Sequence, residues 1–163
     1  MRVTLNQCER KLAEMLSEGR FRGNRESGVA NSRVGPQSDK ETDLEGISGE
    51  IAFSKLFNIY PDMNTNERSD YDAVIMGERI DVKTTKYPNG RLLVRKEKKD
   101  HPADWYALMV GQFPVYELVG FAKSEAVFQR ENLMDLGHGM SYGVSGKSLY
   151  MPKTFMLALK VKL

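Results

Sequence analysis

The sequence predicts one α/β domain that spans residues 1–163. Two segments carry apolar residues at helical spacing, about 4–18 and 38–58, and later segments show the alternation of short strands: 72–76, 79–85, 91–95, 105–110 and 115–122. A chain of 163 residues, 40% hydrophobic and 28% charged, is large enough and ordinary enough in composition to bury one core. We see no internal repeat and no linker-like stretch that would divide it.

The first helix is predicted over residues 4–18, with Gly19 as its end. Its apolar stripe is formed by Leu5, Cys8, Leu12, Met15 and Leu16, so Cys8 is expected in the core. Residues 19–37 are rich in Arg, Gly, Ser and Asn and are predicted to form a long loop that leads into the core. Loops of this length in compact domains are uncommon and are often functional.

The second helix is predicted to begin at Ser38 and to continue to about Asn58. Ser38 and Glu41 have the spacing of a capping box, in which each side chain bonds the backbone N–H of the other. A third helix is predicted from Ser124 to about Asn132, and the Gly-rich residues 137–146 are expected to be a loop. For residues 155–163 the pattern leaves strand and helix open.

The hairpin at 72–85 has one apolar and one charged face. With Gly77 and Glu78 as the turn, Asp72 is expected opposite Lys83, and Asp81 shares their face because alternate strand residues point the same way. The other face is apolar and consists of Ala73, Ile75, Ile80 and Val82. A cross-strand ion pair between Asp72 and Lys83 would account for two of the charges and leave Asp81 without a structural reason.

The preceding helix offers a third carboxylate to this charged face. Glu50 is favoured over Glu45 because it shares a helical face with Gly46, Phe53 and Phe57, where the helix would pack on a sheet. A cluster of carboxylate oxygens suits Mg²⁺, with Mn²⁺ as a substitute, better than it suits a soft metal. Such an ion assists phosphodiester hydrolysis, and a nearby lysine can orient water or offset negative charge.

Basic residues are concentrated locally although the net charge of the chain is only +2. Local density of this kind favours a polyanionic partner, whereas the simpler alternative is a solvated surface. The candidate nucleic-acid-binding residues are Arg20, Arg22, Arg25, Arg33, Lys86, Arg91, Arg95, Lys96, Lys98 and Lys99.

The N-terminal residues are polar where a signal peptide needs an apolar run, and no apolar run reaches the roughly 18 residues of a membrane-spanning helix. Cys8 is the single cysteine. These features predict a cytoplasmic protein, or one in the host cytoplasm if a phage encodes it, without a membrane partner.

The string Ile80-Asp81-Val82-Lys83, preceded by Asp72 and by Glu50 on a helix, resembles the PD-(D/E)XK nuclease superfamily, which has the restriction-endonuclease-like fold. The wider strings Gly49-Glu50 and Asp70-Tyr71-Asp72 are similar to its small phage and bacterial members. The resemblance covers roughly residues 42–123. It departs from the named pattern at Tyr71, where the pattern has Pro.

This resemblance implies a central mixed β-sheet flanked by helices in the order αβββαβ, and a Mg²⁺-dependent endonuclease acting on DNA, with RNA as an open alternative. It implies that Asp72 and Asp81 bind the metal, that Val82 lends its backbone carbonyl and that Lys83 positions water. Glu50 would complete the site, and Asp70 is a substitute ligand. The alternative is a non-catalytic nucleic-acid-binding module on the same fold. Pairing into a homodimer is a hypothesis for cutting both strands.

Overall fold

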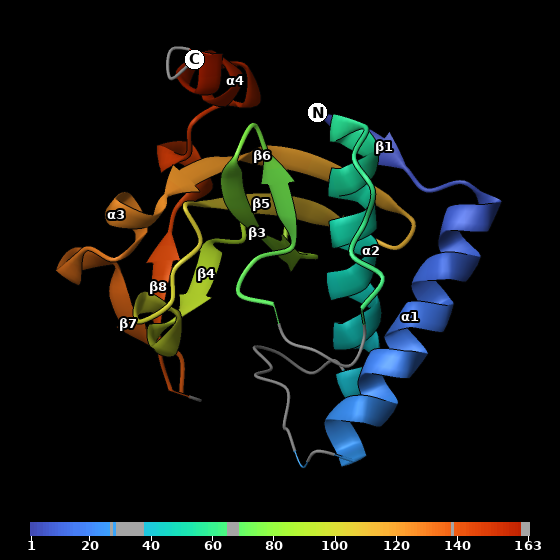
Figure 1. Cartoon of the computed structure of the whole chain (residues 1–163). Helices are drawn as coiled ribbons and strands as arrows, with labels where there is room; N and C mark the ends of the chain where they lie inside the picture. Colours follow the sequence, from blue (N-terminus) through green and yellow to red (C-terminus); the bar gives the residue numbers. More distant parts are fainter. Residues whose placement is uncertain (27, 29–37, 65–68, 138, 161–163) are drawn as a thin grey trace.

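The computed structural model describes residues 1–26, 28, 38–64, 69–137 and 139–160. It is a mixed α/β structure in which helices cover one side of a five-stranded sheet and a smaller sheet covers the other (Figure 1). The helices are α1 (Gln7–Glu26), α2 (Asp39–Phe57), α3 (Ser124–Val127) and α4 (Pro152–Lys160). Short 3₁₀ helices are η1 (Lys96–Lys99), η2 (Arg130–Asn132) and η3 (Gly146–Ser148).

The large sheet is mixed and has the strand order β1-β6-β5-β3-β2, with β3 and β5 parallel and the other pairs antiparallel. Its strands are β1 (Arg2–Thr4), β2 (Ala73–Ile75), β3 (Glu78–Thr85), β5 (Trp105–Gln112) and β6 (Val115–Lys123). The small antiparallel sheet has the order β4-β8-β7 and consists of β4 (Leu92–Arg95), β7 (Leu133–Asp135) and β8 (Met140–Val144). Strand β5 is central, and β3 lies between it and the edge strand β2. The connection from β3 to the parallel strand β5 contains β4 and the 3₁₀ helix η1 and no α-helix.

Both faces of the large sheet are covered, and the alternation along β5 shows how. Trp105, Ala107 and Met109 pack in one hydrophobic cluster with residues of α1, α2 and α4. Tyr106 and Leu108 pack in a second cluster against β4 and β8. Because strand side chains alternate between faces, one strand serves two cores.

Helix α2 has the ends that the sequence predicts. The Ser38 hydroxyl accepts a bond from the Glu41 N–H, and the Glu41 carboxylate accepts one from the Ser38 N–H at 2.7 Å. At the other end Asn58 adopts a left-handed conformation with φ 51° and donates its N–H to carbonyls of the last turn. Helix α2 can pack tightly on β3 because Gly49 has no side chain: a Cβ at this position would stand 1.9 Å from the Thr84 hydroxyl oxygen.

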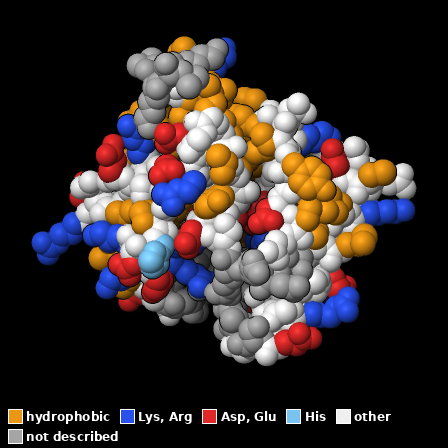
Figure 2. Space-filling model, viewed as in Figure 1, with side chains coloured by type: hydrophobic (Ala, Val, Ile, Leu, Met, Phe, Trp, Pro, Cys, Tyr) orange, Lys and Arg blue, Asp and Glu red, His pale blue; other side chains and the backbone are white. Residues whose placement is uncertain are grey.

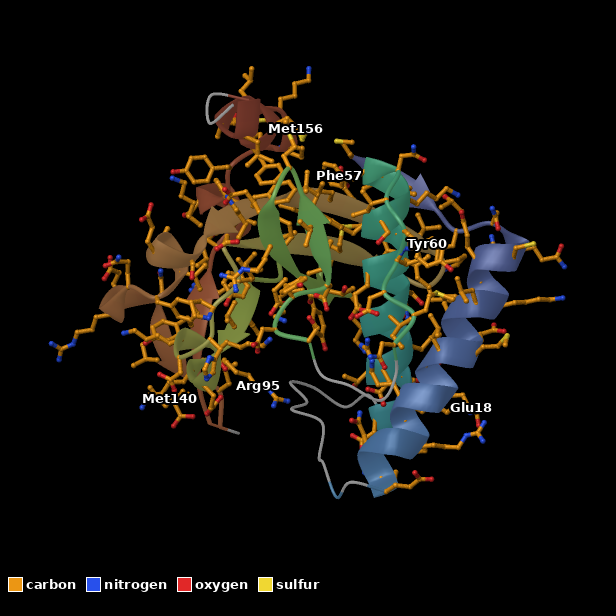
Figure 3. All side chains as sticks on the ribbon, in the orientation of Figure 1. Glu18, Phe57, Tyr60, Arg95, Met140 and Met156 are labelled. Carbon is orange, nitrogen blue, oxygen red and sulfur yellow. The ribbon has the colours of Figure 1, made fainter. Side chains whose placement is uncertain are left out.

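Helix α4 settles the segment that the sequence pattern left open. Its Phe155 ring stacks on Phe121 of β6 with ring centroids 3.7 Å apart and lies 6.5 Å from Phe57 at the end of α2. Figure 3 shows Phe57 and Met156 between the end of α2 and α4, where Met156 packs against the first cluster. An amphipathic helix buries these apolar residues on one side only, and Leu157 faces solvent on the other.

Helix α1 is longer than predicted and continues through Gly19 to Glu26. The predicted loop therefore begins later, and Arg20, Arg22 and Arg25 are helical residues. Packing of α1 beside α2 outweighs the propensity cost of glycine (Figure 1). The expectation for Cys8 was also wrong: it is exposed, because the stripe that faces α2 is centred on Ala13 and Ser17.

Three other predictions were wrong. Met76 and Gly77 form the hairpin turn, with φ of 51° and 84°, instead of Gly77 and Glu78. Within the predicted loop 137–146, residues 140–144 form the strand β8, because pairing with β4 and β7 outweighs its glycine content. The third helix ends at Val127 and has Lys123 in place of Ser124 as its N-cap residue, after which the chain turns to pack Phe128 in the second cluster.

Candidate functional site

The hairpin presents its charged residues as expected but in a different register. Ala73 pairs with Ile80, and Asp72, the residue before β2, donates its N–H to the Ile80 carbonyl at 2.8 Å, so Asp72 does not lie opposite Lys83. The turn moved by one residue, which shifts each partner by two positions and leaves the faces unchanged. The charge of Asp81 acts directly on the Asp72 carboxyl, so the two carboxylates of the predicted site lie near each other.

Asp81 is the most deeply buried charge of the site. Its side chain is 2% exposed, its Oδ1 bonds the Lys83 ammonium, and Lys98 Nζ lies 3.4 Å from its Oδ2. That Oδ2 is buried and has no hydrogen bond. On the other side Asp81 is next to Tyr106 in the parallel register, and burial together with the Asp81 charge raises the pKa of the Tyr106 phenol. A buried carboxylate oxygen without a hydrogen bond is costly unless a cation satisfies it.

Asp72 is held by the backbone of the neighbouring strand. Its Oδ2 accepts a hydrogen bond from the Val82 N–H at 2.7 Å. Burial, and then the negative charges of Glu50 and Asp81, hold the pKa of the Asp72 carboxyl well above its usual range, although Lys83 and the Val82 bond act in the opposite direction. Glu50 and Asp81 thus both lie close enough to Asp72 to disfavour its charge.

Lys83 joins this cluster from the same strand face. Burial alone lowers the pKa of the Lys83 ammonium, but the charges of Asp81, Asp72 and Glu50 outweigh burial and raise it. The side chain is 30% exposed, so it reaches from the buried Asp81 towards solvent. Lys83 therefore remains a cation that can contact an anionic ligand entering from outside.

Glu50 and Glu45 lie on α2 but have different surroundings. The Glu45 carboxylate accepts bonds from the Phe113 N–H at 3.2 Å and from the Tyr116 hydroxyl at 2.7 Å, so it fixes the turn between β5 and β6. The Glu50 carboxylate accepts bonds from both terminal nitrogens of Arg20, at 3.0 and 3.1 Å, and its charge acts on Asp72. Of the two, the structure brings Glu50 to the Asp72 cluster.

Two cations that the sequence placed among the candidate nucleic-acid-binding residues contact the carboxylates of this cluster instead. Arg20 was expected in a loop, and the signal available for its position was its spacing of three and seven from Ser17 and Ala13, which continues the buried stripe of α1. Lys98 Nζ contacts the Asp70 carbonyl at 3.1 Å as well as Asp81. Asp70 itself lies beside Lys98, with its side chain 57% exposed.

Among the described residues, the other predicted nucleic-acid-binding side chains are exposed or have partners outside this cluster. Arg22 and Arg25 are paired with Glu18 and Asp39 at 3.9 and 2.8 Å. Arg91, Arg95, Lys96 and Lys99 are exposed along β4 and η1, and Lys86 lies over the Tyr87 ring in the turn after β3. Arg33 lies outside the described residues. In Figure 2 acidic side chains appear in a recess near the centre of the face shown.

Whether the cluster could hold a divalent cation depends on the oxygen ligands that its side chains offer. Among the residues that the structure describes, no group of three or more His, Cys, Asp or Glu side chains is arranged to hold a metal ion. Asp72 and Asp81 supply carboxylates whose charges interact, and the buried Asp81 Oδ2, which lies 3.4 Å from Lys98 Nζ, has no hydrogen bond. Mg²⁺ is commonly held by one or two carboxylates together with water and phosphate oxygens, so this donor chemistry fits a hard cation.

All of these site residues lie in the part of the chain that a known family covers. The profile of a family described as a family of unknown function, DUF5843, matches residues 1–113. The chain belongs to this family. The match includes α1, α2, the β2–β3 hairpin and η1, and so every residue of the cluster in this DUF5843 member. No curated protein and no solved structure matches the chain. Within the described ranges, no helix is both long and apolar enough to cross a membrane.

Proposed function

We propose that this chain is a metal-dependent endonuclease that hydrolyses phosphodiester bonds in DNA, on a restriction-endonuclease-like core. The observation that carries the proposal is the grouping of three carboxylates and a lysine: the charges of Asp81 and Glu50 both act on Asp72, and Lys83 is bonded to Asp81. Three carboxylates are rarely grouped at the edge of a core for structural reasons alone, because like charges raise the free-energy cost of burying each one.

In this proposal Asp72, Asp81 and the Val82 carbonyl hold Mg²⁺ or Mn²⁺, and Glu50 completes the site. Such an ion, when bound, polarises the scissile phosphate and activates water. Lys83 orients the attacking water or offsets the negative charge that develops on the phosphate, since its ammonium reaches solvent beside Asp81. The exposed basic residues of β4 and η1 hold the DNA backbone by neutralising phosphates.

A specific observation favours the second candidate, a nucleic-acid-binding module without catalysis. Each carboxylate except Asp72 has a cationic partner: Arg20 for Glu50, and Lys83 and Lys98 for Asp81. Three such pairs would also be expected of a purely structural network. The two candidates differ in whether the chain binds a divalent cation.

The test is cleavage of supercoiled plasmid with Mg²⁺, Mn²⁺ or EDTA, comparing wild type with Lys83→Ala. We expect metal-dependent cutting that Lys83→Ala loses by at least about 100-fold, the usual scale for a general acid–base or electrostatic group. Lys40→Ala is the control, because Lys40 is an exposed lysine on α2 whose Nζ is 3.7 Å from Glu18. Cutting by Lys83→Ala at the wild-type rate would show that the site is wrong. Salt-sensitive DNA binding, with neither cleavage nor calorimetric uptake of Mn²⁺, would favour the binding module.

A further inference from the structure

Arg20 makes a contact at the candidate site that no sequence motif indicated. Its guanidinium donates two parallel bonds to Glu50, 3.0 Å to Oε1 and 3.1 Å to Oε2, across the packing of α1 on α2. A two-bond guanidinium–carboxylate pair fixes both the position and the plane of the carboxylate, which a single bond does not.

The pair is more enclosed than the other ion pairs between the two helices. Glu50 is 15% and Arg20 30% exposed, whereas Glu9 and its partner Lys55 are 23% and 37% exposed, Asp39 and Arg25 20% and 42%, and Glu18 and Lys40 49% and 64%. Exposed pairs of the latter kind contribute little to stability, while geometry in an enclosed pair is held more firmly. Burial by itself lowers the pKa of the Arg20 guanidinium, and the charges of Glu50, Asp72 and Asp43 outweigh it and raise the pKa.

The positive charge of Arg20 interacts with the hairpin residue Asp72 as well as with Glu50. Asp72 in turn feels the negative charge of Glu50. Without the positive charge of Arg20, nothing at Glu50 would offset its repulsion from Asp72, and the longer Glu50 side chain would be the one free to turn away. Arg20 lies within the 20-residue helix α1 and not on a loop, so its position is set by the packing of α1.

We propose that Arg20 is a positioning residue of the site, which holds the Glu50 carboxylate beside Asp72 so that Glu50 can complete the binding of a divalent cation. The inference rests on the proposed function, because it assigns Arg20 a role at that metal site. Groups that hydrogen-bond a metal-ligating carboxylate orient it, and their removal commonly costs 10- to 100-fold in metal affinity or activity.

An electrostatic argument alone predicts the opposite sign. A guanidinium near a metal site repels the incoming cation, so its removal would tighten binding if Arg20 served only as a nearby charge. The sign of the change in affinity therefore separates a positioning residue from a bystander. The two-bond geometry favours positioning, because a bystander charge has no need of a defined plane.

The experiment is calorimetric titration of the full chain with MnCl₂, using wild type, Arg20→Gln, Arg20→Lys and Glu50→Gln. Arg22→Gln is the matched control, since Arg22 lies on the same helix, is 70% exposed and touches Glu18 alone among the described acidic residues, at 3.9 Å. We expect Arg20→Gln to weaken Mn²⁺ binding by about 10-fold or more. Arg20→Lys should lie in between because lysine offers one point of contact, and Arg22→Gln should match wild type.

Non-additivity provides a second measurement that a structural role would not produce. If Arg20 acts through Glu50, the double variant Arg20→Gln/Glu50→Gln binds Mn²⁺ no more weakly than Glu50→Gln alone. If the double variant instead loses Mn²⁺ affinity by the product of the two single losses, the inference is overturned. Unchanged or tighter Mn²⁺ binding by Arg20→Gln, in a protein that thermal unfolding shows to be folded, would overturn it as well. Absence of Mn²⁺ binding by wild type would instead overturn the proposed function, and the inference with it.

Discussion

Asp72→Asn should make this protein more stable and inactive at the same time. The substitution keeps the shape of the side chain, and the amide oxygen can accept the Val82 N–H bond that Asp72 Oδ2 now accepts at 2.7 Å. It removes the negative charge that burial, Glu50 and Asp81 all disfavour. The attraction to Lys83 is lost, but the raised pKa of Asp72 shows that the unfavourable contributions exceed it.

The magnitude and its pH dependence follow from linkage. A folded-state pKa above the usual value for an aspartate means that ionisation of Asp72 destabilises the fold, so stability declines as the pH rises from about 4 through the folded pKa. Asparagine does not ionise, so the variant does not lose stability in this way as the pH rises. Relief of one unfavourable group of this kind is worth on the order of 1 kcal/mol, which corresponds to an increase in Tm of about 2–4 °C for a domain of this size.

Thermal unfolding followed by circular dichroism in EDTA, at pH 8 and at pH 5, measures the effect. We expect Asp72→Asn to unfold at a higher temperature at pH 8 and to show a smaller gain at pH 5, where the wild-type carboxyl is more fully protonated. The exposed Asp100, changed to Asn, is the control and should shift neither value. A lower Tm for Asp72→Asn at pH 8, or an equal gain at both pH values, would refute the reasoning, and retained plasmid cleavage would refute the role of Asp72.

Two further predictions concern helix α2. Gly49→Ala should lower the free energy of unfolding by about 1–3 kcal/mol in a urea titration, because the added Cβ would overlap Thr84. Gly46→Ala has open space around it and should raise the free energy of unfolding by up to about 1 kcal/mol. A loss of equal size in both variants would contradict this reasoning. Glu45→Gln should cost about 1–3 kcal/mol in the same titration, because the amide turns the charge-assisted bonds from the Phe113 N–H and the Tyr116 hydroxyl into weaker neutral ones and places an NH₂ group beside the Phe113 N–H. Mn²⁺ affinity should stay at the wild-type value, and its loss would mean that Glu45 belongs to the metal site.

The sequence by itself determined the features that depend on neighbouring residues. Ser38 and Glu41 lie three residues apart, so the capping box and the start of α2 follow from contacts within one turn. The faces of the β2–β3 hairpin follow from the two-residue period of strands, and the register error did not alter them because it moved each partner by an even number of positions. The apolar hairpin residues Ala73, Ile75 and Ile80 are buried as that pattern predicts.

Tertiary structure decided the features that depend on residues far apart in the chain. Residues 140–144 form a strand because β4, some fifty residues earlier, pairs with them, and α1 continues through Gly19 because α2 lies beside it. Arg20 reached Glu50 for the same reason: thirty residues separate them, and only the packing of two helices brings the guanidinium to the carboxylate. Local periodicity contains no information about such pairs, whose free energy comes from burial and charge in the assembled fold. The two aspartates and the lysine of the site were therefore visible as a motif, while the arginine that faces their glutamate was not.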